Sequence, residues 1–380
     1  MIKILFILPY YKIGGTLTSF VNLIPLIDKA RYEVNAYAVT NDVDDFTILP
    51  SGVNYIGLGH SNSKKATSSR SVKGRIIDWL KAGRRLLAKI GFDFSDIVFR
   101  KMAKPLSGKY DVVIAFQEGT ATRMAQFISA PLKIAWMHSM YSRFKGSSRA
   151  SDVDVYNKYD KIVCVSHTAA KDMENSEPQW QGKISVVYNA VNAANLLKKS
   201  AGGCAFSKKI NIVSVGRIDP VKRFSYIPSI TSRLKEAGLD FDWWIIGGVA
   251  VQDEYNQLLH NIRQFDVSDC VKLMGVLSNP YPHIKSSDLL VCLSSSETFN
   301  YTIAEAKAIG TPVVTTDFSS AFEFVENGKT GLIFPIKKVA DGIIGILEDK
   351  NLYSKIKNCL VSEQGQAPVT REQFELLLKR

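Results

Sequence analysis

The chain has 380 residues, 46% of them hydrophobic and 22% charged, which fits two folded domains and excludes a mainly disordered chain. No run approaches the ~20 apolar residues that a membrane span needs, and the apolar start lacks the small-residue cleavage site of a signal peptide. The five cysteines are scattered and odd in number, which predicts a reducing cytoplasm rather than a disulfide framework or a zinc site.

The net charge of +12 is concentrated in one segment. Residues 60–105 hold 12 basic and three acidic side chains, which predicts a local anionic partner. From 75 to 90 the apolar residues share one half of a helical wheel, and Lys81, Arg85 and Lys89 lie opposite. This helix either packs on its domain with its charged face in water, or binds an anionic membrane or a lipid-linked phosphate. The stretch alone slightly favours packing.

The first half of the chain alternates strand-like and helical runs, which predicts a parallel, doubly wound sheet. A strand at 2–9 leads through Gly14 and Gly15 into a helix at 16–26. The two glycines either let the backbone approach a ligand or only permit a tight turn, and no G-x-G-x-x-G fingerprint is present. Further strands are predicted at 34–39, 53–58, 110–116, 132–137 and 161–165.

Two polar residues directly follow strands of this half, Glu118 and His138. The carboxyl ends of parallel strands meet at the edge of the sheet where ligands bind. Glu118 therefore either contacts a ligand or is an ordinary exposed glutamate, and His138 either contacts a ligand or is a side chain satisfied by its neighbours. Taken alone, each residue supports the ordinary interpretation at least as well. A segment at 195–209 is predicted to be a linker, after which a second series of strands and helices begins.

The most informative stretch is 289–314, which predicts a strand, a loop with three serines, a helix ended by Gly310 and Pro312, and another strand. Glu297 lies ahead of that helix and Glu305 in its early turns. Backbone N–H groups at a helix start bind anions, and a carboxylate accepts hydrogen bonds from a vicinal diol. The stretch therefore suits a ligand that joins a sugar, a diphosphate and a ribose.

Arg217 and Lys222 follow an earlier strand end of the same half. They either form surface salt bridges or neutralise a diphosphate, for which arginine supplies a planar fork and lysine a compact charge. The spacing of Glu297 and Glu305 favours the second interpretation.

Three motifs together resemble the retaining glycosyltransferases of family four, which have the GT-B fold: Gly216-Arg217-x4-Lys222, the run at 296–314, and 327–332. The resemblance is looser in the amino half and excludes 60–105. It implies two Rossmann-like, doubly wound α/β domains facing a central cleft. The expected organisation is an acceptor domain at 1–194 with a basic insert at 60–105, a linker at 195–209, a nucleotide-sugar domain at 210–362, and a terminal helix at 363–380.

The resemblance also implies the roles of individual residues. Arg217 and Lys222 would hold the donor diphosphate, Glu305 the ribose hydroxyls, Glu297 the transferred sugar, and His138 the donor sugar near the reacting carbon. The implied donor-binding positions besides Glu305 are Gly14, Gly15, Gly216, Gly247, Val276, Thr298, Phe299 and Asn300.

The chain departs from the family pattern at several positions. Asn300 stands where glycine is common after the motif's phenylalanine, which is expected to alter the sugar pocket. The family pattern usually has glycine at the position of Ala190 and aspartate at the position of Ser139. The run Gly247-Gly248-Val249 lacks the second part of the usual Gly-x-Gly-Pro. No charged group of the motifs is lost, so activity is expected, but the identity of the donor is not inherited.

The predicted function is transfer of a sugar from a UDP- or GDP-sugar to a saccharide acceptor, lipid-linked, in surface polysaccharide or glycan assembly. The expected transfer is of hexosyl type with retention, without a metal or other cofactor, and with Glu118 as a guess for acceptor contact. The protein is expected in the cytoplasm, attached to the inner face of the membrane if 60–105 binds it. The alternatives are a non-catalytic sugar-nucleotide- or partner-binding protein on the same fold and, less favoured because no recognition motif is present, a nucleic-acid-binding protein.

Overall fold

The computed structural model describes residues 1–379 except 13, 41, 58–94, 145–148, 203, 205, 207–209 and 364–369. The chain divides into two compact units. The amino-terminal unit consists of Met1–Cys164, Met173–Ser185 and Leu377–Arg380. The carboxyl-terminal unit consists of Val165–Asp172 and Val186–Leu376. The predicted basic helix at 75–90 lies outside the described residues, so its two interpretations stay open.

The first sheet has seven strands in the order β3-β2-β1-β4-β5-β6-β7, and β1 to β6 pair in parallel. Within this sheet, the strand at residues 2–8 is buried on both faces, because residues 4–8 are all apolar and fully covered. The strands are β1 Ile2–Leu8, β2 Tyr32–Ala38, β3 Asn54–Ile56, β4 Val112–Ala115, β5 Leu132–Met137, β6 Lys161–Cys164 and β7 Ile184–Val186. The helices along this part of the chain are α1 Gly15–Leu23, α3 Ser95–Ala103, α4 Thr120–Ala125, α5 Arg149–Tyr156 and α6 His167–Ser176.

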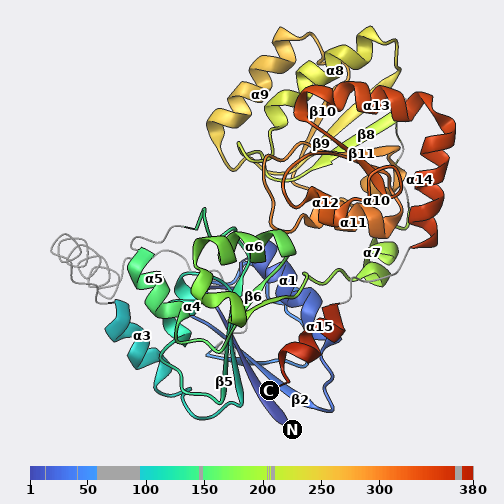
Figure 1. Ribbon diagram of the computed structural model, residues 1–380. Coiled ribbons are helices and arrows are strands. Elements are labelled where there is room, and N and C mark those ends of the chain that lie inside the picture. Colours follow the sequence, from blue (N-terminus) through green and yellow to red (C-terminus); the bar gives the residue numbers. More distant parts are fainter. Residues whose placement is uncertain are drawn as a thin grey trace, which may run out of the picture. The chain divides into compact units, whose positions relative to one another are not determined.

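The second sheet has six parallel strands in the order β10-β9-β8-β11-β12-β13. These strands are β8 Ile210–Val215, β9 Phe241–Ile246, β10 Val271–Gly275, β11 Leu289–Cys292, β12 Val313–Thr316 and β13 Gly331–Phe334. The helices are α7 Ala193–Lys199, α8 Ile227–Glu236, α9 Gln252–Gln264, α10 Tyr281–Ser286, α11 Tyr301–Ile309, α12 Ala321–Phe324, α13 Val339–Glu348, α14 Lys350–Ser362 and α15 Thr370–Leu377. Figure 1 shows α8, α9 and α13 on one side of this sheet and α10, α11 and α12 on the other.

The strand orders confirm the predicted parallel, doubly wound architecture. In each sheet the strand order reverses once, between β1 and β4 and between β8 and β11. Ligands of such sheets bind at the carboxyl ends of the strands beside this reversal. The segment predicted as a linker, 195–209, starts within α7, and α7 packs against α11.

The carboxyl ends of β8 and β9 approach so closely that one residue there must be glycine. The N–H of Gly216 donates to the carbonyl of Ile246 over 2.9 Å, and the N–H of Gly247 donates to the carbonyl of Gly275 over 2.8 Å. A Cβ on Gly247 would lie 1.7 Å from the carbonyl oxygen of Gly216, and Gly247 has a φ of +153°. This glycine therefore lets the two strand ends meet, independently of any ligand.

We expect Gly247→Ala to lower the free energy of unfolding by about 3 kcal/mol or more, because both the backbone conformation and the contact with Gly216 become strained. Gly345→Ala is the matched control, because a Cβ there, on the exposed side of α13, meets no atom within 4 Å. It should be neutral or stabilise by up to about 1 kcal/mol. Urea unfolding of both variants measures the difference, and equal stabilities would contradict the geometric argument.

Candidate active site

The loop after β8 is fixed by one aspartate, Asp219. Its Oδ1 accepts hydrogen bonds from the backbone N–H groups of Val221 and Lys222, over 3.0 and 3.1 Å. The N–H of Ser295, in the loop after β11, donates to the carbonyl of Val221 over 2.8 Å. The two loops at the strand reversal are therefore joined through their backbones. The role of Asp219 was not predicted, although an Asp-Pro pair ahead of Lys222 is a turn signal.

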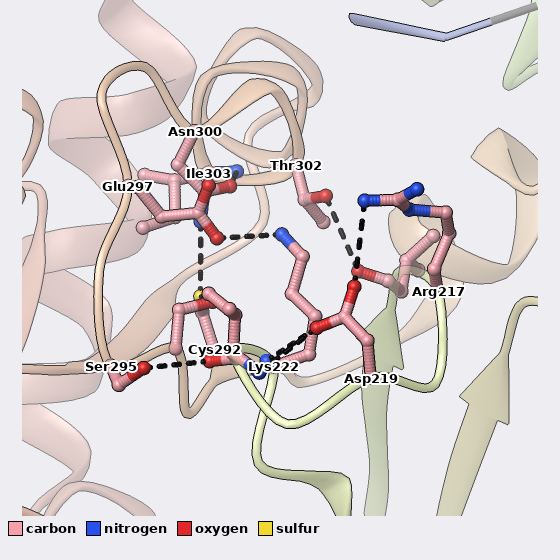
Figure 2. Close-up of polar contacts among 12 residues, drawn as sticks. Arg217, Asp219, Lys222, Cys292, Ser295, Glu297, Asn300, Thr302 and Ile303 are labelled. Carbon is pink, nitrogen blue, oxygen red and sulfur yellow. Dashed lines mark hydrogen bonds and ion pairs between the residues drawn. The ribbon is translucent and has the colours of Figure 1, made fainter. Parts of the chain in front are cut away.

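Lys222 and Glu297 form an ion pair within this joined region, shown in Figure 2. The Nζ of Lys222 lies 2.6 Å from Oε1 of Glu297, and the side chains are only 19% and 14% exposed. Burial by itself lowers the pKa of Lys222, but the charge of Glu297 and its hydrogen bond, together with Cys292 and Asp219, outweigh this effect, so that the pKa lies above its usual value. The lysine is therefore charged at neutral pH.

Arg217 lies at the same strand end but differs in exposure. Its side chain is 78% exposed, and its ion pair with Asp219 spans 3.5 Å, as Figure 2 shows. An exposed pair of this kind contributes little to stability. The guanidinium can therefore leave Asp219 for an anionic ligand at small cost.

The start of α11 is held by Asn300, whose side chain is 1% exposed. Its Oδ1 accepts from the N–H of Ile303 over 3.0 Å, and its Nδ2 donates to Sγ of Cys292 over 3.1 Å (Figure 2). This is an N-cap combined with a link to the end of β11. The side chain of Asn300 thus points into the unit, so only its backbone is suited to touch a donor.

Phe299 has a similar position. Its ring is 7% exposed and packs edge to face with Tyr301 and Phe324, with centroids 4.9 Å apart in both pairs. A large buried aromatic ring stabilises the loop by packing. As with Asn300, the contribution of Phe299 to a ligand is limited to its backbone.

Glu305 lies on α11, and neither Lys222 nor Glu297 contributes to the shift of its pKa. Burial raises the pKa of Glu305 to about 7, against the opposing effects of a hydrogen bond from Tyr281 and the charge of Lys199. The hydroxyl of Tyr281, on α10, donates to Oε1 of Glu305 over 3.1 Å. Tyr281 was not among the predicted residues, since nothing in the local sequence distinguishes it.

Three further predicted positions of this unit lie at the carboxyl ends of β8, β9 and β10, and Thr298 lies in the loop between β11 and α11. Gly216 and Gly247 meet at the ends of β8 and β9, and Val276 follows β10. The side chain of Val276 is 77% exposed, and its Cγ2 would lie 3.0 Å from a Cβ on Gly248. An exposed apolar side chain beside two glycines forms a surface that a flat ring can cover.

In the amino-terminal unit, Glu118 and His138 occupy one loop system. Glu118 is 8% exposed, and its two oxygens accept hydrogen bonds from the N–H of His138, over 2.9 Å, and from the hydroxyl of Ser139. Burial lowers the pKa of His138 to about 4, although the charge of Glu118 opposes this. The imidazole is therefore neutral at pH 7 and lies parallel to the ring of Trp136. Glu118 is not an exposed side chain; it holds the loop after β5.

Gly14 and Gly15 lie where β1 leads to α1. Gly14 is the N-cap of α1 with an extended φ of 170°, and a Cβ on either glycine would meet no atom within 4 Å. The described part of the chain therefore does not itself require glycine at these positions. Open space at a helix start is compatible with the close approach of a ligand.

Among the described residues, no three His, Cys, Asp or Glu side chains are grouped so as to hold a metal ion. Within the same residues, no helix has the length and apolar character needed to cross a bilayer.

The two parallel, doubly wound units have the architecture of the GT-B fold, as the motifs predicted. Residues 199–359 match the family described as glycosyl transferases group 1. This range contains Arg217, Lys222, Glu297 and Glu305. The resemblance to GT-B glycosyltransferases is therefore confirmed.

Individual proteins agree with this assignment. The chain is 26% identical to N-acetylgalactosamine-N,N'-diacetylbacillosaminyl-diphospho-undecaprenol 4-alpha-N-acetylgalactosaminyltransferase of Campylobacter jejuni, over 72% of either chain. It is 24% identical to the lipopolysaccharide core biosynthesis glycosyltransferase LpsE of Rhizobium meliloti, over 68% of this chain and 78% of that protein. In structure it resembles Anabaena HepE in complex with UDP and glucose, with a TM-score of 0.70, 17% identity, and 99% and 98% of the two chains covered.

We expect a double-mutant cycle to show strong coupling between Lys222 and Glu297. Glu297→Ala leaves a poorly exposed ammonium without its partner and should cost about 2 kcal/mol of unfolding free energy. Adding Lys222→Ala should cost less than the sum of the single changes, because the stranded charge is then gone. Urea unfolding measures all four proteins. Strictly additive costs would show that the pair contributes no coupling.

Proposed function

We propose that the chain is a retaining glycosyltransferase that moves a sugar from a UDP- or GDP-sugar to a saccharide acceptor. The observation that carries the proposal is the pairing of Lys222 with Glu297 at the reversal of the second sheet, where ligands of such sheets bind. A charged lysine held there matches the negative charge that develops on a departing diphosphate. The match of residues 199–359 to group 1 glycosyl transferases supports the same chemistry.

The donor is bound as follows. Arg217 swings from Asp219 to the diphosphate, while Lys222 contacts it as a point charge. Glu305 accepts hydrogen bonds from the ribose hydroxyls, and the exposed side chain of Val276 covers the nucleobase. The backbones of Gly216, Gly247, Thr298, Phe299 and Asn300 complete the donor site. Gly14 and Gly15 let the backbone approach the phosphate.

The chemistry consists of positioning and electrostatic stabilisation. Lys222 neutralises the leaving diphosphate, and Glu297 orients the sugar through its hydroxyl groups. The departing phosphate takes the proton of the acceptor hydroxyl on the same face of the sugar, so no protein nucleophile and no metal are required. His138, neutral at pH 7, contacts the donor sugar without adding a charge near the reacting carbon.

The acceptor is a lipid-linked saccharide of surface polysaccharide or glycan assembly. Two similar proteins support this: the name of one specifies a diphospho-undecaprenol acceptor, and that of the other lipopolysaccharide core biosynthesis. The basic residues of 60–105 bring the enzyme to the anionic inner face of the membrane from the cytoplasm. Since Glu118 is engaged with the loop after β5, its part in acceptor binding is indirect.

We expect Lys222→Ala to lower turnover by roughly 10²–10³-fold, because a preorganised group that stabilises the leaving charge is lost. A thermal-shift screen of nucleotide sugars identifies the donor first, since ligand binding raises the apparent stability. Donor hydrolysis and transfer then measure turnover.

The control is Lys235→Ala, which removes a lysine paired with Asp269 on the surface of the same unit. Its turnover should equal that of the unaltered protein. Normal turnover of Lys222→Ala would refute the assignment. Binding without turnover in the unaltered protein would favour a non-catalytic role.

We expect the triple change of Lys81, Arg85 and Lys89 to Gln to weaken binding to anionic vesicles by roughly 10²-fold, at about 1 kcal/mol per basic residue. Cosedimentation with vesicles of anionic and of neutral lipid measures the effect at low salt. The matched control changes Lys329, Lys337 and Lys338 of the other unit to Gln, and should bind as the unaltered protein does. Equal weakening by both triple changes would show that only the net charge matters.

A further inference from the structure

Tyr281 joins the candidate ribose site through α10. We propose that Tyr281 is a positioning residue for ribose recognition, whose hydroxyl orients the Glu305 carboxylate and keeps it available as an acceptor. This rests on the proposed function, in which Glu305 binds the ribose of the donor. No motif includes Tyr281, and its role follows from its contacts alone.

The position of Tyr281 is set from both ends of α10. At the start, its N–H donates to Oδ1 of Asn279 over 3.3 Å, and Nδ2 of Asn279 donates to the carbonyl of Lys199, at the end of α7, over 2.8 Å. Towards the other end, the hydroxyl of Thr311 donates to the carbonyl of Ile284 over 2.8 Å. Helices α7, α10 and α11 pack against one another. The phenol is therefore held in place by the fold.

The hydroxyl of Tyr281 is a constant donor. Burial raises the pKa of Tyr281, and the charge of Glu305 raises it further, so the phenol keeps its proton at physiological pH. It occupies one acceptor position on Oε1 of Glu305, at 3.1 Å. An ionised carboxylate has about four such positions, which leaves enough for two ribose hydroxyls. Tyr281 therefore restrains the position of Oε1 and leaves the other acceptor positions of the carboxylate open.

The same hydrogen bond favours the ionised form of Glu305. Burial raises the pKa of Glu305 to about 7, while the bond from Tyr281, on α10, and the charge of Lys199, on α7, act against this rise. Loss of the Tyr281 hydroxyl lets the pKa of Glu305 rise further. Because the protonated carboxyl accepts fewer hydrogen bonds, affinity for ribose should increase as the pH rises through this pKa. In a protein without the hydroxyl, the increase should come at a higher pH.

The experiment compares Tyr281→Phe with the unaltered full-length chain, using UDP, GDP and their 2′-deoxy forms as probes. Isothermal titration calorimetry from pH 5.5 to 9 gives the ratio of ribonucleotide to deoxynucleotide affinity. Because the phosphates titrate alike in both nucleotides, their effect on affinity cancels in this ratio. We expect the ratio of the unaltered protein to rise near pH 7. In Tyr281→Phe the midpoint should move up by about one pH unit, and the ratio at pH 7 should fall about five- to tenfold, as expected for a lost hydrogen bond to a charged group.

Tyr353→Phe is the matched control, because it also removes a phenol hydrogen bond, of 3.2 Å, from Tyr353 on α14 to the carbonyl of Asp288. It should keep the profile of the unaltered protein, whereas Glu305→Gln should give a ratio independent of pH. An unchanged midpoint in Tyr281→Phe, or the same shift in Tyr353→Phe, would overturn the role of Tyr281 and leave the proposed function standing. Failure of the unaltered protein to bind either nucleotide would overturn both.

Discussion

The contact between Lys222 and Glu297 is the interaction on which the site depends. It joins the loops after β8 and β11, which are neighbours in the sheet but far apart in the chain. With exposures of 19% and 14%, neither charge is well solvated, so each needs the other until a ligand arrives. A diphosphate that approaches Lys222 therefore meets a cation that is already ionised and oriented. The backbone bond between Ser295 and Val221 joins the same two loops independently of the ion pair.

The sequence was sufficient to predict the architecture and the placement of Lys222 and Glu297 at one edge of the second sheet. Alternation of strands and helices predicted both parallel sheets, because strands buried on two faces are uninterrupted apolar runs. The convergence of Lys222 and Glu297 followed from the rule that parallel strands end at one edge. The sequence did not predict which strands are neighbours in the second sheet, since only the observed pairing places β8 beside β11. Ser295 was missed for this reason, because its hydrogen bond to Val221 crosses from one strand end to the other. The contacts of Asp219 with Val221 and Lys222 are local, so its Asp-Pro turn signal could have revealed them.

The directions of individual side chains were the least predictable feature. Asn300 replaces a glycine of the family pattern and was expected to change the sugar pocket. In the structure, its amide caps α11 and contacts Cys292, a residue whose proximity depends on the path of the whole loop. Glu118 was considered as an acceptor contact or an exposed residue. It is buried because β4 and β5 are adjacent, which brings its carboxylate to the N–H of His138.

The two glutamates of the 289–314 stretch have different electrostatic surroundings, although they belong to one motif. Glu297, in the loop, is paired with an ammonium, so its charge is neutralised before a ligand binds. Glu305, on the helix, has a phenol as its direct partner and a pKa of about 7, since burial outweighs the nearby positive charge. The charge of Glu305 therefore responds to small changes in its surroundings, including two hydrogen bonds donated by the hydroxyl groups of a ligand. The same residue type, eight positions apart, thus supplies a group fixed by its counterion and a group whose ionisation a bound diol would itself favour.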